Sequence, residues 1–215
     1  MGYCQSDEIS LLLIDYQTLT SQAFFDYEVQ KVCSITASMA TLAFNNAIVA
    51  NAAKYFESYV KEHDLLYLPD DMDKYCNAIQ KSVDKGAMFD SRCFNLVKEE
   101  VANYFLWRQL DATRNSIQMV GQANFSHKEL QGKSCNAIQD MLHEQRGINW
   151  NDLPTYQKRG SCCIKVDEVA PRAIKELSDG SGVYNKGDVI RRKWVIDNEI
   201  PIFTGNGRQY IERLI

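Results

Sequence analysis

The residues with the clearest chemical potential lie near the start of the chain, at Gln5-Ser6-Asp7-Glu8. Two adjacent carboxylates lead directly into the largely apolar run 9–14, which has the length of a β-strand. Because neighbouring side chains in a strand point to opposite faces, Asp7 and Glu8 cannot both face the core. One of them could therefore serve at a Mg²⁺ site for phosphoryl transfer. A two-metal site draws its carboxylates from several elements, so this segment supplies only part of one.

A second set of polar residues recurs along the segment 98–125, which we predict to be a long helix. Residues three or four apart share one face of a helix, so Arg108, Asp111 and Asn115 line up. In one interpretation the stripe is a buried structural network in which Asp111 pairs with Arg108 or Arg114. In the other it contacts nucleotide or RNA, since arginine and asparagine are good donors to phosphates and base edges.

The segment 148–160 gathers two asparagines, two aromatic residues, a proline, a lysine and an arginine between a predicted helix and a predicted strand. Loops on a rigid scaffold often carry function, so this segment is a candidate phosphate- or base-binding loop. Gly160 would let the backbone turn into the next strand. The basic pairs and triplets at Lys158-Arg159 and at 191–193 are either solvated surface or phosphate contacts.

The hydrophobic pattern and the turn residues predict the elements that position these side chains. We expect strands at 5–15, 87–96 and 161–166, with strand-like runs over 194–203. We expect helices at 24–60, 98–125, 135–145 and 206–214, the third capped by Ser134 and ended by Gly147. Loops or turns are expected at 66–73 and 178–182. Strands separated by long helices, together with hairpin-like strands, indicate an α+β fold.

Composition limits the class of protein further. The chain has 215 residues, of which 45% are hydrophobic and 24% charged, as in a globular protein. No uninterrupted apolar run reaches the roughly 18 residues of a membrane span, and the first residues lack the basic region of a signal peptide. Seven cysteines without C-x-x-C spacing favour a reduced, cytoplasmic compartment over a disulfide framework or a zinc site. We therefore expect a cytoplasmic protein without a membrane partner.

The net charge of −4 is unevenly distributed along the chain. Residues 1–100 hold 8 Lys+Arg against 15 Asp+Glu, a balance of −7, whereas residues 101–215 hold 16 against 13, a balance of +3. The whole molecule is therefore not a general nucleic-acid binder. Any contacts with RNA phosphates are expected from the basic residues of the second half.

Four segments occur in an order that resembles one known family: Gln5–Ser10, Phe89–Arg92, Tyr104–Asn115 and Asn149–Gly160. Together they are similar to the tRNA-histidine guanylyltransferase family, most of all to its bacterial and phage-type members. The similarity covers nearly the whole chain. The W-R-Q-x-D and N-x-L-P-x-Y segments are specific in combination, whereas S-D-E alone would be a weak signal.

The resemblance implies a truncated polymerase-like palm (ferredoxin-like) over 1–96, N-terminally incomplete, and a helical and β-hairpin domain over 97–215. Members of the family add nucleotides, guanylate in particular, to the 5′ end of tRNA in the 3′-to-5′ direction. They do so in tRNA-His maturation or in the repair of 5′-truncated tRNAs. The resemblance also implies two Mg²⁺ ions, GTP and ATP as substrates, tRNA as partner, and a homo-oligomer that is a tetramer.

The resemblance assigns roles to nine residues by position. The catalytic carboxylates would be Asp7, which is also the metal ligand, and Glu8. The nucleotide-binding residues would be Ser6, Lys31 and Ser34, although Lys31 also fits a solvated helix face. The residues in contact with tRNA or triphosphate would be Arg108, Asn115, Lys158 and Arg159.

The chain departs from the family pattern at its start. The family begins with an R-x-D-G-x-x-F-H-x-F type motif whose Asp is the first metal ligand, and the Asp-Gly pair at 179–180 has the wrong context for it. We therefore expect a family member without its N-terminal segment, through a mis-assigned start, a split gene or true loss. Two alternatives remain: a catalytically inactive tRNA- or nucleotide-binding remnant, and a plain α+β scaffold.

Overall fold

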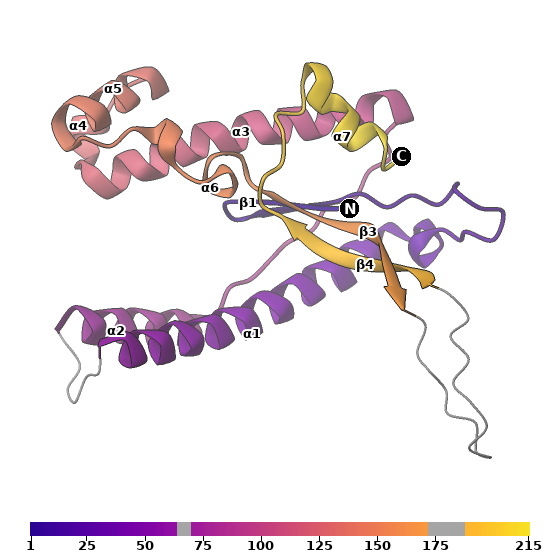
Figure 1. The fold of residues 1–215 in the computed structure, drawn as a ribbon, viewed down its shortest axis with the longest axis horizontal. Coiled ribbons are helices and arrows are strands. Elements are labelled where there is room, and N and C mark those ends of the chain that lie inside the picture. The colour runs from indigo at the N-terminus through magenta and orange to yellow at the C-terminus, as the bar shows by residue number, and fades with distance from the viewer. Residues whose placement is uncertain (64–69, 172–187) are drawn as a thin grey trace, which may run out of the picture. The chain divides into compact units, whose positions relative to one another are not determined.

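The computed structural model describes residues 1–63, 70–171 and 188–215 (Figure 1). It divides into two compact units, one made of Met1–Ile14 and Leu96–Ile215 and the other of Asp15–Asn95. The first unit contains β1 (Gly2–Gln5), β2 (Glu8–Leu11), α3 (Lys98–Asn124), α4 (His127–Leu130), α5 (Cys135–Arg146), η2 (Trp150–Asp152), α6 (Thr155–Arg159), β3 (Ser161–Pro171), β4 (Asp188–Asp197), η3 (Gly205–Arg208) and α7 (Gln209–Glu212). The second contains η1 (Phe24–Tyr27), α1 (Val29–His63) and α2 (Asp70–Lys85). The predicted α+β class is confirmed, and the division into domains 1–96 and 97–215 stays a prediction.

Among the described residues of the first unit, four antiparallel strands form a sheet in the order β2-β1-β3-β4. Strand β1 pairs with β2 on one side and with β3 on the other, where Gly2 lies opposite Cys163. Strands β3 and β4 form a long hairpin, as expected for the second half of the chain. The N-terminal strands β1 and β2 therefore belong to the same sheet as the C-terminal strands β3 and β4.

The predicted single strand 5–15 is wrong. Residues 2–11 form a hairpin in which Gln5 pairs with Glu8, so Ser6 and Asp7 make a two-residue turn. Ser6 has φ 50°, as the first central position of such hairpin turns requires. The sequence lacks the usual Asn-Gly or Asp-Gly signal at this point, which is why the turn was not predicted.

Helix α3 covers one face of this sheet, and its predicted limits are confirmed. Glu99 and Glu100 occupy its first turn, where the helix dipole favours acidic side chains. The core between helix and sheet consists of Tyr3, Val101, Ala102, Phe105, Cys162, Ile164, Ile200, Phe203 and Ile211. The segment 198–204, which follows β4, is joined to this core through the side-chain amide of Gln109. This amide accepts a hydrogen bond from the Phe203 N–H and donates one to the Pro201 carbonyl, each at 2.9 Å. The strand-like runs predicted over 194–203 are therefore too long, because β4 ends at Asp197.

A smaller core forms at the C-terminal end of α3, where Ile117 and Phe125 pack against Ile138 and Leu142 of α5. The predicted caps of α5 are both present. The Ser134 hydroxyl accepts a hydrogen bond from the Ala137 N–H, and Gly147 has φ 65° at the C-cap. The segment 148–160 leaves this helix and leads into β3.

In the second unit, the predicted strand at 87–96 is wrong. This segment runs along α1, and its backbone groups are satisfied by helix side chains rather than by a neighbouring strand. Asn45 accepts from the Ala87 N–H at 2.8 Å and donates to the Ala87 carbonyl at 3.0 Å, and Thr41 accepts from the Phe89 N–H at 3.1 Å. A strand needs a ladder partner, and strand propensity alone does not supply one.

Two further predictions for the second unit need correction. The long helix begins at Val29, because residues 24–27 form a separate turn in which Phe25 and Asp26 have left-handed φ values of 49° and 55°. The predicted loop 66–73 was also too long. Residues 64–69 lie outside the described residues, but α2 begins at Asp70. The predicted turn at 178–182 also lies outside the described residues.

Helix α1 is long and apolar enough to cross a membrane by length and composition, with a mean hydropathy of 1.4 over an 18-residue window. The core helix of a soluble protein satisfies the same test, so this finding alone assigns no membrane contact. The predicted absence of a membrane partner stays a prediction.

Candidate functional site

Asp7 lies at the exposed tip of the β1–β2 hairpin. The two-residue turn leaves its carboxylate open to solvent, beside Ser6, whose hydroxyl lies 3.8 Å from the Met119 sulfur of α3. An exposed carboxylate at a turn can bind a cation that also contacts a bound nucleotide. The hairpin therefore presents the predicted metal ligand in an accessible position.

Glu8 has different surroundings from its neighbour. Its carboxylate accepts a hydrogen bond from the Gln5 side-chain amide at 2.6 Å and forms an ion pair with Arg108 of α3. The Arg108 side chain is 10% exposed and the Glu8 side chain 47%, so the pair is buried on the helix side. Glu8 thus ties the tip of the hairpin to α3. Such an anchor fixes the position of Asp7.

The polar stripe on α3 forms one network around Asp111. Its carboxylate lies 3.0 Å from the Arg114 guanidinium and 3.8 Å from that of Arg108, and it accepts a hydrogen bond from the Asn115 amide at 3.3 Å. These contacts match the first interpretation of the stripe, in which Asp111 pairs with Arg108 or Arg114. Contact of Arg108 and Asn115 with tRNA or triphosphate stays a prediction.

The anchoring pair gives a first test. Replacing Arg108 with methionine is expected to lower the free energy of unfolding by roughly 1–3 kcal/mol, because Glu8 and Asp111 lose a buried donor. The lower part of this range applies if water rehydrates the half-exposed Glu8. Arg114→Met is the matched control, because Arg114 pairs with the same Asp111 but is 62% exposed, and we expect a change within about 0.5 kcal/mol. Urea denaturation measures both, and equal losses would show that the Glu8–Arg108 pair anchors nothing.

The segment 148–160 is held by internal contacts. The Trp150 indole N–H donates to the Ser116 hydroxyl at 3.0 Å. The Lys158 ammonium donates to the Asn151 carbonyl at 2.5 Å and lies 6.0 Å from the centre of the Trp150 ring. This arrangement places Lys158 over its own loop, and its predicted contact with tRNA stays untested.

The end of this segment is fastened to β1. The Tyr3 hydroxyl donates to the Arg159 carbonyl at 2.6 Å, and burial raises the pKa of this phenol above its usual value, so the hydroxyl keeps its proton as a donor. Gly160 follows with φ 84°, and its Cα packs close to the Cys4 carbonyl. The predicted turn at Gly160 is therefore confirmed. The side chain of Arg159 is half-buried, and its predicted contact with tRNA stays untested.

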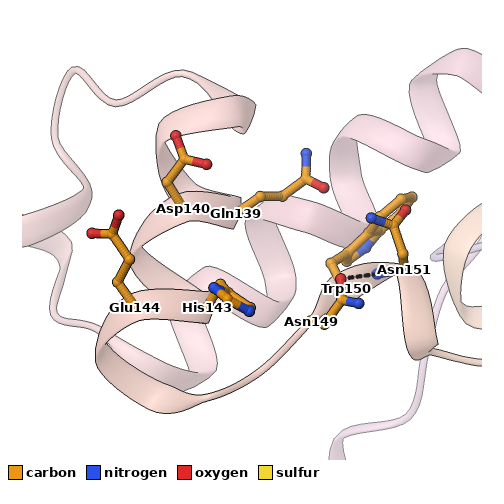
Figure 2. A pocket seen from close by; sticks show the side chains of 7 residues that line it. All are labelled: Gln139, Asp140, His143, Glu144, Asn149, Trp150 and Asn151. Carbon is orange, nitrogen blue, oxygen red and sulfur yellow. Dashed lines mark hydrogen bonds between the residues drawn. The ribbon is translucent and has the colours of Figure 1, made fainter.

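A hollow of about 240 Å³ lies between α5 and η2 (Figure 2). Its lining residues are Gln139, Asp140, His143, Glu144, Asn149, Trp150 and Asn151. The two carboxylates disfavour a phosphate in this hollow, and its side-chain amides would suit a base edge better. The α5 side of the hollow was not predicted from the sequence, although its acidic residues share one helix face at i, i+4 spacing.

The predicted triphosphate contacts Lys31 and Ser34 lie in the other compact unit, in the first turns of α1. Lys31 is 3.8 Å from the Glu28 carboxylate and 5.5 Å from the Phe25 ring centre, and it borders a hollow of about 710 Å³. Ser34 donates to the Lys31 carbonyl at 3.3 Å. Both side chains are accessible, and their nucleotide contacts stay predictions.

The basic cluster at 191–193 faces acidic residues across the β3–β4 hairpin. Arg192 lies 3.4 Å from the Asp167 carboxylate and Lys193 lies 3.9 Å from that of Glu168. These exposed pairs contribute little to stability, and a phosphate can compete for either cation. Arg191 is also exposed on this hairpin.

The described residues do not form a two-ion metal site. Within residues 1–63, 70–171 and 188–215, no three histidine, cysteine, aspartate or glutamate side chains come together in a set that could hold a metal. The open carboxylate of Asp7 fits a single Mg²⁺ that keeps several waters and is held mainly by nucleotide phosphates. The second carboxylate of this segment, Glu8, is already paired with Arg108.

Comparison with solved structures of similar sequence and fold identifies the family of this chain. The chain is 37% identical to a bacterial tRNA(His) guanylyltransferase (Thg1)-like protein solved in complex with ATP, and the match covers 100% of this chain and 70% of that one with a TM-score of 0.63. The chain belongs to the tRNA(His) guanylyltransferase family. The family model for tRNAHis guanylyltransferase, Thg1, matches residues 1–97. The predicted family is thus confirmed.

Two further proteins are similar to this chain. A bacterial Thg1-like protein in complex with GTP is 35% identical, with a TM-score of 0.58, over 99% of this chain and 67% of that one. The tRNA(His) guanylyltransferase of Saccharomyces cerevisiae is 26% identical over 182 residues, 79% of this chain and 64% of the yeast protein. The chain spans 59% and 64% of the length of two curated relatives that it matches.

Proposed function

We propose that this protein is a tRNA nucleotidyltransferase that adds nucleotides, guanylate in particular, to the 5′ end of tRNA in the 3′-to-5′ direction. Its roles would be maturation of tRNA-His or repair of truncated 5′ ends. The observation that carries the proposal is the exposed Asp7 carboxylate at a hairpin tip, anchored through Glu8 and Arg108, in a member of the tRNA(His) guanylyltransferase family.

The substrates follow from the same relatives. Bacterial Thg1-like proteins have been solved in complex with ATP and with GTP, and we propose both nucleotides as substrates of this chain. Ser6, Lys31 and Ser34 would contact the nucleotide. Mg²⁺, when bound, would neutralise charge on the triphosphate. A cytoplasmic location and a homo-oligomer, a tetramer by resemblance, belong to the same proposal.

The protein's own residues would act mainly by position and charge. Asp7 would bind the cation that accompanies the triphosphate, and the Glu8–Arg108 pair would hold the hairpin that carries Asp7. Asn115 would offer an amide to the nucleotide or the tRNA. Phosphoryl transfer depends largely on such positioning and electrostatic stabilisation, so small displacements of the hairpin should affect the rate strongly.

A second candidate function is binding of tRNA or nucleotide without catalysis. One observation favours it: the described residues contain no set of three side chains that could hold a metal ion. The two candidates differ in one readout, since both predict tRNA binding but only the first predicts a covalent product.

The test uses the full-length protein, labelled GTP, ATP, Mg²⁺ and a 5′-truncated tRNA other than tRNA-His. The proposal predicts incorporation of label into the truncated tRNA and little into the same tRNA with an intact 5′ end. Binding of the truncated tRNA without incorporation would overturn the enzymatic proposal and support the binding function. Failure to bind either tRNA would overturn both.

The tRNA contacts have a test of their own. The double variant Lys158→Ala/Arg159→Ala is expected to bind tRNA about tenfold more weakly, with the slope of log affinity against log salt reduced by roughly 0.7–0.9 for each lost phosphate contact. Lys128→Ala/Lys133→Ala is the matched control, since it removes two exposed lysines from the same unit. Fluorescence anisotropy over a salt series measures both. An equal loss in the two variants would show that the 158–159 pair makes no particular contact.

A further inference from the structure

Cys33 and Cys93 bring two thiols into contact within the second unit. The Cys33 sulfur lies 3.6 Å from the Cys93 sulfur, and both residues are half-buried and reduced. Cys33 lies in the first turns of α1, and Cys93 lies on the extended segment that follows Gly86. They are 60 residues apart in the chain, so the contact depends on how this segment packs.

This contact is the last of a regular series between α1 and the extended segment. Every second residue from Ala87 to Cys93 faces the helix, as expected of an extended chain. The successive contacts are Ala87 with Asn45, Phe89 with Thr41, Ser91 with Thr36, and Cys93 with Cys33. The Thr36 and Ser91 hydroxyls lie 2.8 Å apart. The hydrogen bonds before it therefore hold the sulfur pair in register.

We propose that Cys33 and Cys93 form a redox-sensitive dithiol, a modification site at which a small disulfide such as oxidised glutathione creates an intramolecular bond between α1 and the segment 86–95. The sulfurs need to approach from 3.6 Å to about 2.05 Å, the length of a disulfide bond. The inference does not depend on the proposed function.

The chemistry is ordinary thiol–disulfide exchange. The thiolate of one cysteine attacks a sulfur of oxidised glutathione, forms a mixed disulfide and releases one glutathione thiolate. The thiolate of the second cysteine then attacks the protein sulfur of that mixed disulfide, and the second glutathione leaves. Two protein thiols are oxidised, one oxidised glutathione is reduced to two thiols, and the two cysteine protons pass to them.

A reducing compartment would keep this pair as thiols, and an oxidising interval would join them. The bond would close a loop that contains α2 and most of α1. A loop of this length strongly restricts the unfolded chain, so the oxidised protein should melt several degrees higher than the reduced one. It would also fix the end of α1 that carries Lys31 and Ser34.

The test incubates the fully reduced protein with a series of glutathione redox buffers, alkylates the remaining thiols and maps the peptides by mass spectrometry. The expected result is a Cys33–Cys93 linked peptide, roughly tenfold more abundant than any other linked pair because this pair is held at contact distance. The Cys76→Ser variant, which removes a half-buried cysteine of the same unit, should keep this peptide.

The Cys93→Ser variant should instead leave Cys33 as a glutathione adduct and should lose the rise in melting temperature on oxidation. The peptide mapping uses the wild-type protein, so the proposal can still be tested if the Cys93→Ser variant does not fold. Recovery of Cys33 and Cys93 as separate adducts or free thiols, under conditions that oxidise other cysteines, would overturn the proposal. Pairing of Cys33 with a different cysteine would overturn it as well.

Discussion

Replacement of Asp7 with asparagine is expected to reduce GTP incorporation into a 5′-truncated tRNA at least about 100-fold, because the cation at the triphosphate loses its protein carboxylate. The melting temperature should stay nearly unchanged, because Asp7 is exposed at a turn and asparagine is well accommodated in turns. Parallel incorporation and thermal-melting assays measure the two effects.

Glu99→Gln is the matched control for this variant. Glu99 is an exposed carboxylate of the same compact unit, in the first turn of α3, so its replacement changes the net charge by the same amount. Incorporation should remain close to that of the unaltered protein. If Asp7→Asn kept full activity with normal stability, Asp7 would not be a metal ligand.

Replacement of Gly160 with alanine is expected to lower the free energy of unfolding by roughly 2–5 kcal/mol, because it adds both backbone strain and a steric clash. At φ 84° an L-residue is strained, and the added Cβ would lie 2.4 Å from the Cys4 carbonyl oxygen and 3.0 Å from the Tyr3 ring. The change would separate the 148–160 segment from β1. Urea denaturation measures the loss.

Gly147→Ala separates backbone strain from this contact. Gly147 also has a left-handed φ, 65°, but among the described residues, its own chain neighbours apart, no heavy atom lies within 4 Å of the position that an added methyl carbon would take on its Cα. We expect a loss of roughly 1–2 kcal/mol from strain alone. A loss at Gly160 no larger than that at Gly147 would mean that the Gly160 backbone does not pack against β1.

Local signals in the sequence were sufficient for the helices that carry much of the candidate site. Helix α3 was predictable from its periodic apolar residues and acidic first turn, and α5 from Ser134 and Gly147 at its ends. The Asp111 network followed from i, i+3 and i, i+4 spacing, which any helix enforces. These features depend on residues that are close in the chain.

The features that sequence reasoning missed depend on distant partners. The segment 87–96 has strand-like composition, but its backbone is satisfied by Asn45 and Thr41 of α1. The ion pair between Glu8 and Arg108 joins residues 100 positions apart, and no local pattern indicates it. The hairpin turn at Ser6 uses a residue that turns accept only rarely at positive φ.

The central claim is that nucleotides are added to the 5′ end of tRNA, and the position of the new label tests it most directly. A 5′-truncated tRNA is treated with periodate, which destroys its 3′-terminal diol and blocks any addition there. It is then incubated with the protein, Mg²⁺, ATP and GTP labelled at the α-phosphate. The account predicts undiminished incorporation, with all label at the 5′ end, lost in the Asp7→Asn variant. Incorporation that periodate abolishes, or label mapped to the 3′ end, would contradict it.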